Sequence, residues 1–233
     1  MKRHVLLLIL VLSCMTLPFA AGCGGKSGEA ISDGPFRGGI VPVRITRSSG
    51  MQDGIFGYAG GSGVTGGWIE HPEGTKLLNS DFFIDNLKSW YQTTLYKNWN
   101  SFGSGDYYLK YTIGGETKTL LCPNLSWTLL RTTWNDSPPN YSYDSNSNII
   151  SVFFKQISSS GKVKYYIRLS REGTNYVLYE STPQENAIQL SEYLIGLSNT
   201  PTDEYEMQVF GDVYENDVLK SRYIHLFTNV SLN

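Results

Sequence analysis

Cysteine, histidine and charge are all scarce in this chain, and each scarcity excludes a class of protein. Its 233 residues include three cysteines and three histidines, too few for a disulfide-stapled framework or a metal centre built from those ligands. Charged residues make up 17% and the formal net charge is −2, so the chain lacks the basic field of a general nucleic-acid binder. We therefore expect no metal, no cofactor and no nucleic-acid partner.

Long apolar runs are also missing, except for one at the start of the chain that has the form of a secretory signal. Lys2 and Arg3 precede an apolar core over residues 5–12, and small residues follow at positions 20–22. The run becomes too polar after Ser13 to span a bilayer core of about 30 Å. A transmembrane anchor is the alternative, but no cluster of charges follows the run to stop its transfer.

The junction after this run, Ala-Ala-Gly-Cys at residues 20–23, resembles the lipobox of bacterial lipoproteins. The resemblance implies cleavage just before Cys23 and a lipid on that cysteine, although Ala20 stands where leucine is usual. Residues 1–22 would then be a lipoprotein signal peptide, and residues 23–35 a flexible tether that begins with glycines. The alternative is an ordinary cleaved signal that leaves Cys23 unmodified.

A lipid on Cys23 would make the membrane the first partner of the chain, because each buried CH₂ group contributes about 0.8 kcal/mol to anchoring. The expected location is the bacterial cell envelope, and its outer membrane if the cell has one, with which Gly24 is compatible. Loss of residues 1–22 would remove Cys14 as well. Cys122 would be the remaining thiol, and its place at the end of an apolar run predicts that it is buried and inert.

Short alternation of apolar and polar residues, interrupted by glycine, asparagine, aspartate and proline, predicts an all-β chain. The pattern is clearest over residues 163–170, 205–213 and 223–230. In an antiparallel sheet one face of each strand enters a core while the other faces solvent. The alternation therefore predicts that Glu206 and Asp212 lie on a solvent face.

The second half of the chain resembles a fibronectin type III or immunoglobulin-like domain. The resemblance rests on four segments that match the strands of that family: 150–154 for strand B, 164–169 for strand C, 188–190 for strand E and 205–209 for strand F. Tyr205 takes the place of the family's corner tyrosine, and Phe153 or Phe154 stands where its B strand has a tryptophan. The resemblance implies an antiparallel β-sandwich over residues 124–233.

The first half is less regular, and we predict a second, degenerate immunoglobulin-like sandwich over residues 36–123. Strands over residues 107–113 and 118–122 are joined by Gly114 and Gly115, which suit a type I′ turn because both of its central residues need positive φ. Pro42 indicates an edge strand, since proline cannot donate to a ladder. The predicted fold is two tandem sandwiches after the signal peptide and the tether.

One segment, residues 81–99, does not fit this pattern. Its apolar residues have a helical spacing, as in Phe83, Leu87 and Trp90, whereas Thr93 and Thr94 favour a strand. We predict a short helix or an irregular crossover here.

Residues suited to catalysis are few. His71 falls in a predicted turn and His225 on the outward face of the last strand. Six acids between residues 203 and 217 are predicted to be solvated, with residues 215–217 in a hairpin loop. We therefore expect no catalytic residue and no enzyme activity. A glycan hydrolase would need a carboxylate pair across a cleft, and is the least favoured function.

Aromatic residues are the most suggestive feature, with ten of them between residues 82 and 111. Those left outside a core would offer rigid contact area for a partner. Trp90, Trp99, Tyr96 and Tyr108 are the candidates. The function we expect is a non-enzymatic binding, adhesion or spacer module of the envelope, with a protein or glycan partner. The alternative is a carbohydrate-binding module or accessory subunit for an envelope or extracellular polysaccharide, which an exposed aromatic row would favour.

Overall fold

The structure is a computed structural model that describes residues 35–88, 90–96, 103–127, 134, 136–194, 197 and 205–232. The regular elements in those residues are all β-strands, so the predicted all-β fold is confirmed. Within the same residues, no helix has the length and apolar character needed to cross a membrane.

The strands of the first half follow one another closely in the sequence. They are β1 (Arg37–Arg47), β2 (Gly50–Gly60), β3 (Val64–Glu70), β4 (Phe83–Asp85), β5 (Trp90–Tyr96), β6 (Gly105–Ile113) and β7 (Glu116–Leu125). The order β1-β2-β5-β4 forms one layer, and the order β3-β6-β7 forms a separate three-stranded sheet. An immunoglobulin sandwich arranges its strands in the same way, as ABED and CFG.

The strands of the second half repeat this layered arrangement. They are β8 (Asn140–Asp144), β9 (Ile149–Phe153), β10 (Lys162–Arg171), β11 (Val177–Glu180), β12 (Gln184–Glu185), β13 (Gln189–Tyr193), β14 (Tyr205–Glu215) and β15 (Val218–Val230). The order β13-β9-β8 forms a three-stranded sheet, and β10, β14 and β15 lie side by side in another. Segments resembling strands B and E therefore share one sheet, and those resembling C and F share the other.

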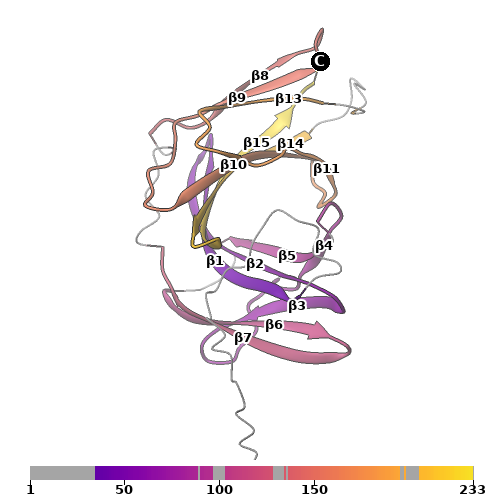
Figure 1. The fold of residues 1–233 in the computed structure, drawn as a ribbon, viewed down its shortest axis with the longest axis vertical. Helices are drawn as coiled ribbons and strands as arrows, with labels where there is room; N and C mark the ends of the chain where they lie inside the picture. The colour runs from indigo at the N-terminus through magenta and orange to yellow at the C-terminus, as the bar shows by residue number, and fades with distance from the viewer. Residues whose placement is uncertain are drawn as a thin grey trace, which may run out of the picture.

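A parallel pair of strands joins the two halves into one nine-stranded sheet. β1 pairs with β15 from Val43 opposite Arg222 to Thr46 opposite His225. The resulting order is β11-β10-β14-β15-β1-β2-β5-β4 (Figure 1). The short strand β12 pairs with β10 beside this order. The prediction that Pro42 marks an edge strand is wrong, because β1 has a neighbour on both sides. Proline is tolerated because the ladder with β15 begins only at the next residue, Val43.

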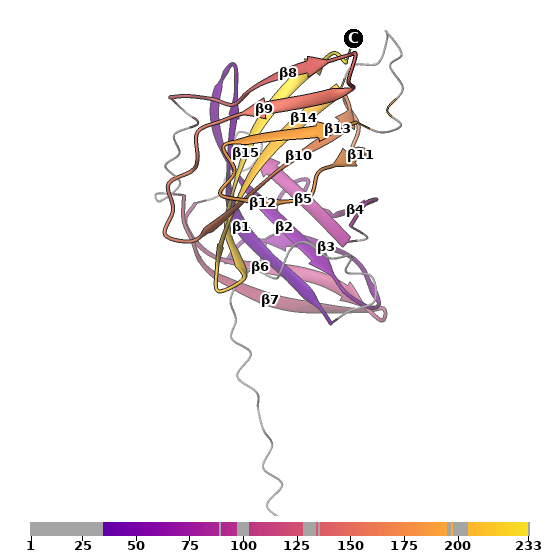
Figure 2. The same cartoon turned by 45° about the horizontal axis from the view of Figure 1, so that its top comes forward.

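The nine-stranded sheet curls until its two edges meet. β4 and β11 approach each other in both cartoon views (Figures 1 and 2). The side-chain amide of Asn86 donates to the carbonyl of Val177 at 2.8 Å and accepts from its N–H at 3.0 Å. The sheet is thus bent round on itself, and its inner face is turned away from solvent.

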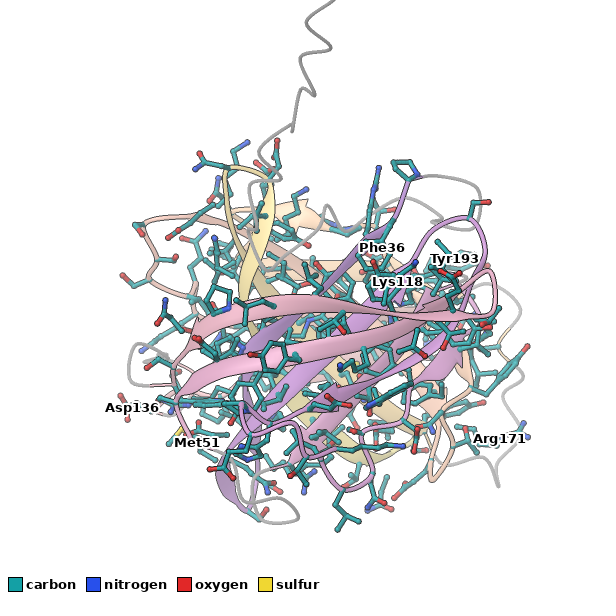
Figure 3. The ribbon with its side chains drawn as sticks, turned by 90° about the horizontal axis from the view of Figure 1, so that it is seen from below. Phe36, Met51, Lys118, Asp136, Arg171 and Tyr193 are labelled. Carbon is teal, nitrogen blue, oxygen red and sulfur yellow. The ribbon has the colours of Figure 1, made fainter. Side chains whose placement is uncertain are left out.

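Both faces of this curled sheet are buried. The outer face packs against the two three-stranded sheets in one large cluster that includes Leu109, Val152 and Val209. Phe36, just before β1, adds to it by stacking on Tyr111 of β6 at a centroid distance of 4.0 Å (Figure 3). The inner face holds a second, separate cluster.

The short helix or irregular crossover predicted for residues 81–99 is wrong, because the described part of this segment forms the hairpin of β4 and β5. Asp85 Oδ1 accepts the N–H groups of Leu87 and Lys88 at 3.0 Å each and so stabilises the turn. The helix-like spacing arises because both faces of β5 are buried: Trp90 packs inside the curl and Leu95 outside it. Such a strand loses the alternation that marks a half-exposed sheet.

The solvent face predicted for the second half is also wrong. Asp212 is fully buried, and Tyr166, Arg168 and His225 are between 2% and 6% exposed. Curling of the sheet covers the face of β10 and β14 that the polar pattern assigned to water. His225 lies on the other face of the sheet, with its ring 4.5 Å from that of Phe227 in the outer cluster.

Two turn predictions are confirmed. Gly114 and Gly115 have φ values of 59° and 83° between β6 and β7. The turn between β14 and β15 lies at Asn216 and Asp217.

Cys122 is fully buried, as predicted, but it is disulfide-bonded, so the prediction of a thiol is wrong. Its partner lies outside the described residues. The sequence reasoning assigned Cys14 to the signal peptide and Cys23 to the lipid, which left no cysteine to predict as a disulfide partner of Cys122.

Candidate binding cavity

The inner face of the curled sheet is built on aromatic rings from two pairs of neighbouring strands, β10 with β14 and β2 with β5. Tyr166 of β10 and Phe210 of β14 stack at a centroid distance of 4.5 Å, with an interplanar angle of 5°. Across the curl, Tyr58 of β2 and Trp90 of β5 lie 5.1 Å apart, and Phe56 lies 6.3 Å from Trp90. These rings form an apolar wall against which charged groups are packed.

The first charged group is the ion pair of Arg222 and Asp212, both almost completely buried. Arg222 donates from Nε to Asp212 Oδ1 and from Nη2 to Oδ2, both at 2.7 Å. The Tyr166 hydroxyl accepts from Arg222 Nη2 at 2.9 Å and donates to Asp212 at 3.1 Å. The guanidinium also lies 3.9 Å above the ring centroid of Phe56, in a cation–π contact.

The second charged group joins the two edges of the sheet. Arg168 donates from Nε to Glu180 at 2.8 Å and from Nη2 to the same carboxylate, while Nη2 also lies 3.0 Å from Asp85 Oδ2. Lys88 Nζ lies 3.0 Å from Glu180 Oε1. Gln92 donates to Asp85 Oδ2 at 2.9 Å. Residues of β4, β5, β10 and β11 therefore meet in one polar network.

Burial and neighbouring charges both shift pKa values in this interior. It raises the pKa of Tyr166 well above its ordinary value and lowers the pKa of Lys88, despite the nearby Glu180. For Arg222, burial acts to lower the pKa, but Asp212 and Tyr166 outweigh it and leave the pKa raised. The guanidinium of Arg222 therefore stays charged, and the Tyr166 hydroxyl stays protonated.

A cavity of about 410 Å³ opens above this network, at the end of the curl where β5, β10, β14 and β15 converge. Its deeper lining includes Arg168, Arg222, Gln92, Phe56 and Phe210. Exposed residues of the turns, such as Asp81 and Asn175, form its lip. Cavities of about 300–1,000 Å³ with a few placed polar groups are typical small-ligand sites.

One polar atom of this lining has no partner. Gln92 is 5% exposed, and its Oε1 is buried without a hydrogen bond among the described residues. A buried acceptor left unsatisfied costs about 1–3 kcal/mol.

The four predicted aromatic residues do not form one exposed row. Trp90 is fully buried on the inner face of β5, and Tyr96, on the same face of that strand, lines the cavity. Tyr108 lies on β6, in a different sheet. Trp99 lies outside the described residues. The structure thus brings Trp90 and Tyr96 into the curled interior and leaves Tyr108 apart from them.

The buried arginines and carboxylates were not predicted as site residues. The one signal in the sequence was the presence of Tyr166 and Phe210 among the polar positions of their strands, where large rings are out of place on a solvated face. The pairing of Arg168 with Asp85 joins residues of the two halves, and no local pattern predicts it.

No protein-family model matches the chain, and no curated protein matches it. Similar solved structures include a cytokine receptor complex, at 11% identity over 81% of this chain and 96% of that one, with a TM-score of 0.29. The chicken CNTN1 FN1–FN3 domains match at 10% identity over 88% of this chain and 69% of that one, also with a TM-score of 0.29. A chimeric titin Z1Z2 matches at 14% identity over 85% and 97%, with a TM-score of 0.26. TM-scores this low do not support any conclusion about this chain.

Proposed function

We propose that this chain is a lipid-anchored protein of the bacterial envelope that binds a ligand without transforming it. The observation that carries the binding role is the cavity over the buried pairs of Arg168 and Arg222. A spacer has no need of such a cavity, which leaves a buried acceptor on Gln92 unsatisfied. The anchor is inferred from the lipobox-like residues 20–23.

The state of the carboxyl groups supports a binding role over hydrolysis. Asp85, Glu180 and Asp212 are each held in an ion pair with a buried arginine. Of the two carboxyl groups in the lining, Asp81 lies 2.6 Å from Lys76 at the surface, and burial raises the pKa of Glu206. A hydrolase needs two carboxyls with matched roles on a substrate, and one of the two in this lining is engaged by a surface lysine.

The anchor is tested by labelling cells that express the full chain with a radioactive fatty acid. We expect label on the wild type and none on Cys23→Ser, which should leave the membrane fraction. Thiol titration of the purified, denatured protein adds a second readout. A disulfide of Cys122 needs Cys14 or Cys23, so cleavage and lipidation at Cys23 would leave Cys122 without a partner in the chain and give one titratable thiol per chain. A chain without label and without a thiol would retain the disulfide and contradict the anchor.

A further inference from the structure

The mouth of the cavity lies between the two edges of the curled sheet. Its lining residues between positions 79 and 83 lead into β4 on one side, and those between positions 173 and 177 lead into β11 on the other. Among the described strands, β4 pairs with β5 alone and β11 with β10 alone. Two edge strands therefore stand beside the mouth, each with a strand on one side.

The edges differ in how their backbone groups are satisfied. In an antiparallel pair every second residue directs its N–H and C=O away from its neighbour. On β11, Val177 does so, and the side-chain amide of Asn86 bonds both groups as a neighbouring backbone would. Beyond its ladder with β5, the backbone of β4 (Phe83–Asp85) has no hydrogen-bond partner within the described residues. An extended backbone is the group that pairs with such an edge.

The cavity beside this edge offers two donors that lack an acceptor. The hydrogen bonds of Arg168 and of Arg222 all use Nε and Nη2, and in the part of the chain that the structure describes Nη1 of neither guanidinium has a partner. Both Nη1 atoms retain accessible surface in the lining. Because Asp85, Glu180 and Asp212 already balance the two charges, these donors suit an uncharged acceptor better than an anion. A peptide carbonyl is such an acceptor.

Exposed apolar side chains flank the mouth on both sides. Leu78 adjoins the lining at Asn79, and Tyr176 adjoins it at Asn175. Ile84 lies on β4 itself. All three are more than half exposed, at 64%, 61% and 56%. Exposed apolar groups beside a free strand edge are contact sites for the side chains of an added strand.

We propose that the mouth of the cavity binds an extended segment of a partner protein by strand addition. The backbone of the segment pairs with the edge of β4, and its carbonyl groups accept from Nη1 of Arg168 and Arg222. Apolar side chains of the segment lie against Leu78 and Tyr176. This inference rests on the proposed binding function and names its ligand as a peptide chain rather than a glycan.

Three substitutions separate this site from the rest of the surface. Tyr176→Lys changes an apolar side chain at the mouth, and Thr94→Trp fills the cavity from a half-buried position of its lining. Ile188→Lys is the matched control, because Ile188 is 69% exposed and lies beside β13, in a separate sheet. Melting temperatures equal to that of the wild type would show that all three variants fold.

The probes are random linear peptides displayed on phage, selected on the full chain purified in detergent and then synthesised. We expect saturable binding by calorimetry, weakened at least about tenfold by Tyr176→Lys and by Thr94→Trp and unchanged by Ile188→Lys. In the complex, hydrogen exchange should slow at the amides of Phe83–Asp85. It should not slow along β7, which is also an edge strand but lies in the separate sheet with β3 and β6.

Methylation of the peptide backbone tests strand addition itself. Added strands direct alternate N–H groups towards and away from the edge. N-methylation of the amides that face β4 should therefore abolish binding, whereas methylation of the alternate set should leave it intact.

The other outcomes separate the two proposals. A peptide whose binding survives both Tyr176→Lys and Thr94→Trp would overturn the mouth as the site. Binding that tolerates methylation of either set of amides would overturn strand addition and keep the binding function. Failure to select any peptide would overturn the peptide inference, and the labelling experiment on Cys23 would still decide the anchor independently.

Discussion

Arg222 is held in the interior by three kinds of contact at once. It forms a two-point ion pair with Asp212, donates to the Tyr166 hydroxyl and lies on the ring of Phe56. Taking both charges out of water costs several kcal/mol per ion, and only such complete pairing offsets that cost. At the scale of the residue, the burial of each of these partners is therefore stable only while the others are present.

Removing one partner should be severe for this reason. Arg222→Met leaves Asp212 buried and uncompensated, and we expect the free energy of unfolding to fall by about 3–5 kcal/mol in urea titrations. Adding Asp212→Asn to Arg222→Met removes the stranded charge and should recover part of that loss. Lys118→Met, which breaks an exposed pair with Glu116, is the control and should cause no measurable change. An equally small effect of Arg222→Met would contradict the account of the interior.

His225 predicts how stability depends on pH. Its Nδ1 lies 2.8 Å from Thr46 Oγ1, and burial lowers the pKa of the ring from 6.5 to about 4. The unfolded chain therefore takes up a proton at a higher pH than the folded one, so the contribution of His225 is complete above pH 6.5 and is lost as the pH falls towards 4. One proton changes stability by at most about 1.4 kcal/mol per pH unit.

The measurement is urea unfolding of the wild type and His225→Gln at several pH values between 7 and 4. The difference in unfolding free energy between the two proteins should shrink as the pH falls. A constant difference across this range would show that the ring titrates alike in both states.

At the scale of the element, the turn between β14 and β15 shows how local chemistry sets register. Asn216 and Asp217 have φ values of 52° and 60°, and Glu215 pairs with Val218 across the turn. Both central residues of a type I′ turn lie in the left-handed region, where asparagine, aspartate and glycine are least strained.

Substitution at Asp217 tests this turn. Asp217→Val forces a β-branched residue to positive φ and should lower the free energy of unfolding by about 1–2 kcal/mol. Asp217→Gly keeps the conformation accessible and should cause no loss. Urea unfolding of the two variants gives the comparison, and equal stability of both would argue against strain at this position.

At the scale of the whole molecule, the parallel pair of β1 and β15 makes one sheet from strands of both halves, and the meeting of β4 with β11 closes it. The network of Arg168 with Asp85 depends on this closure, because Asp85 lies on the edge strand β4 and Arg168 on β10, next to the opposite edge strand β11. The curl therefore decides where the candidate site lies.

Asn86→Ala should loosen this closure. It removes both hydrogen bonds to Val177, and we expect a loss of about 1–2 kcal/mol in unfolding free energy. Hydrogen exchange at the Val177 amide should accelerate more than exchange in β6 and β7, which are remote from the contact. Asn140→Ala, at an exposed residue of β8, is the control. Unchanged exchange at Val177 would show that Asn86 does not hold the edges together.

The sequence by itself determined the class of fold and the position of several turns. Alternation at residues 163–170 and the glycines at 114 and 115 are local signals, because strand pleat and positive φ depend on neighbouring residues only. The same local reasoning resolved neither the hairpin of β4 and β5 nor the surroundings of Asp212.

Only the tertiary structure decided which polar residues are buried. A period of two in the sequence assigns side chains to the two faces of a strand, but it does not determine what covers each face. The curl of the sheet covers the second face, and it depends on contacts between residues as far apart as Asn86 and Val177, which no local pattern encodes. Hence Trp90, predicted as a binding residue, lies in the inner wall, while Arg168, Arg222 and Gln92 line the cavity.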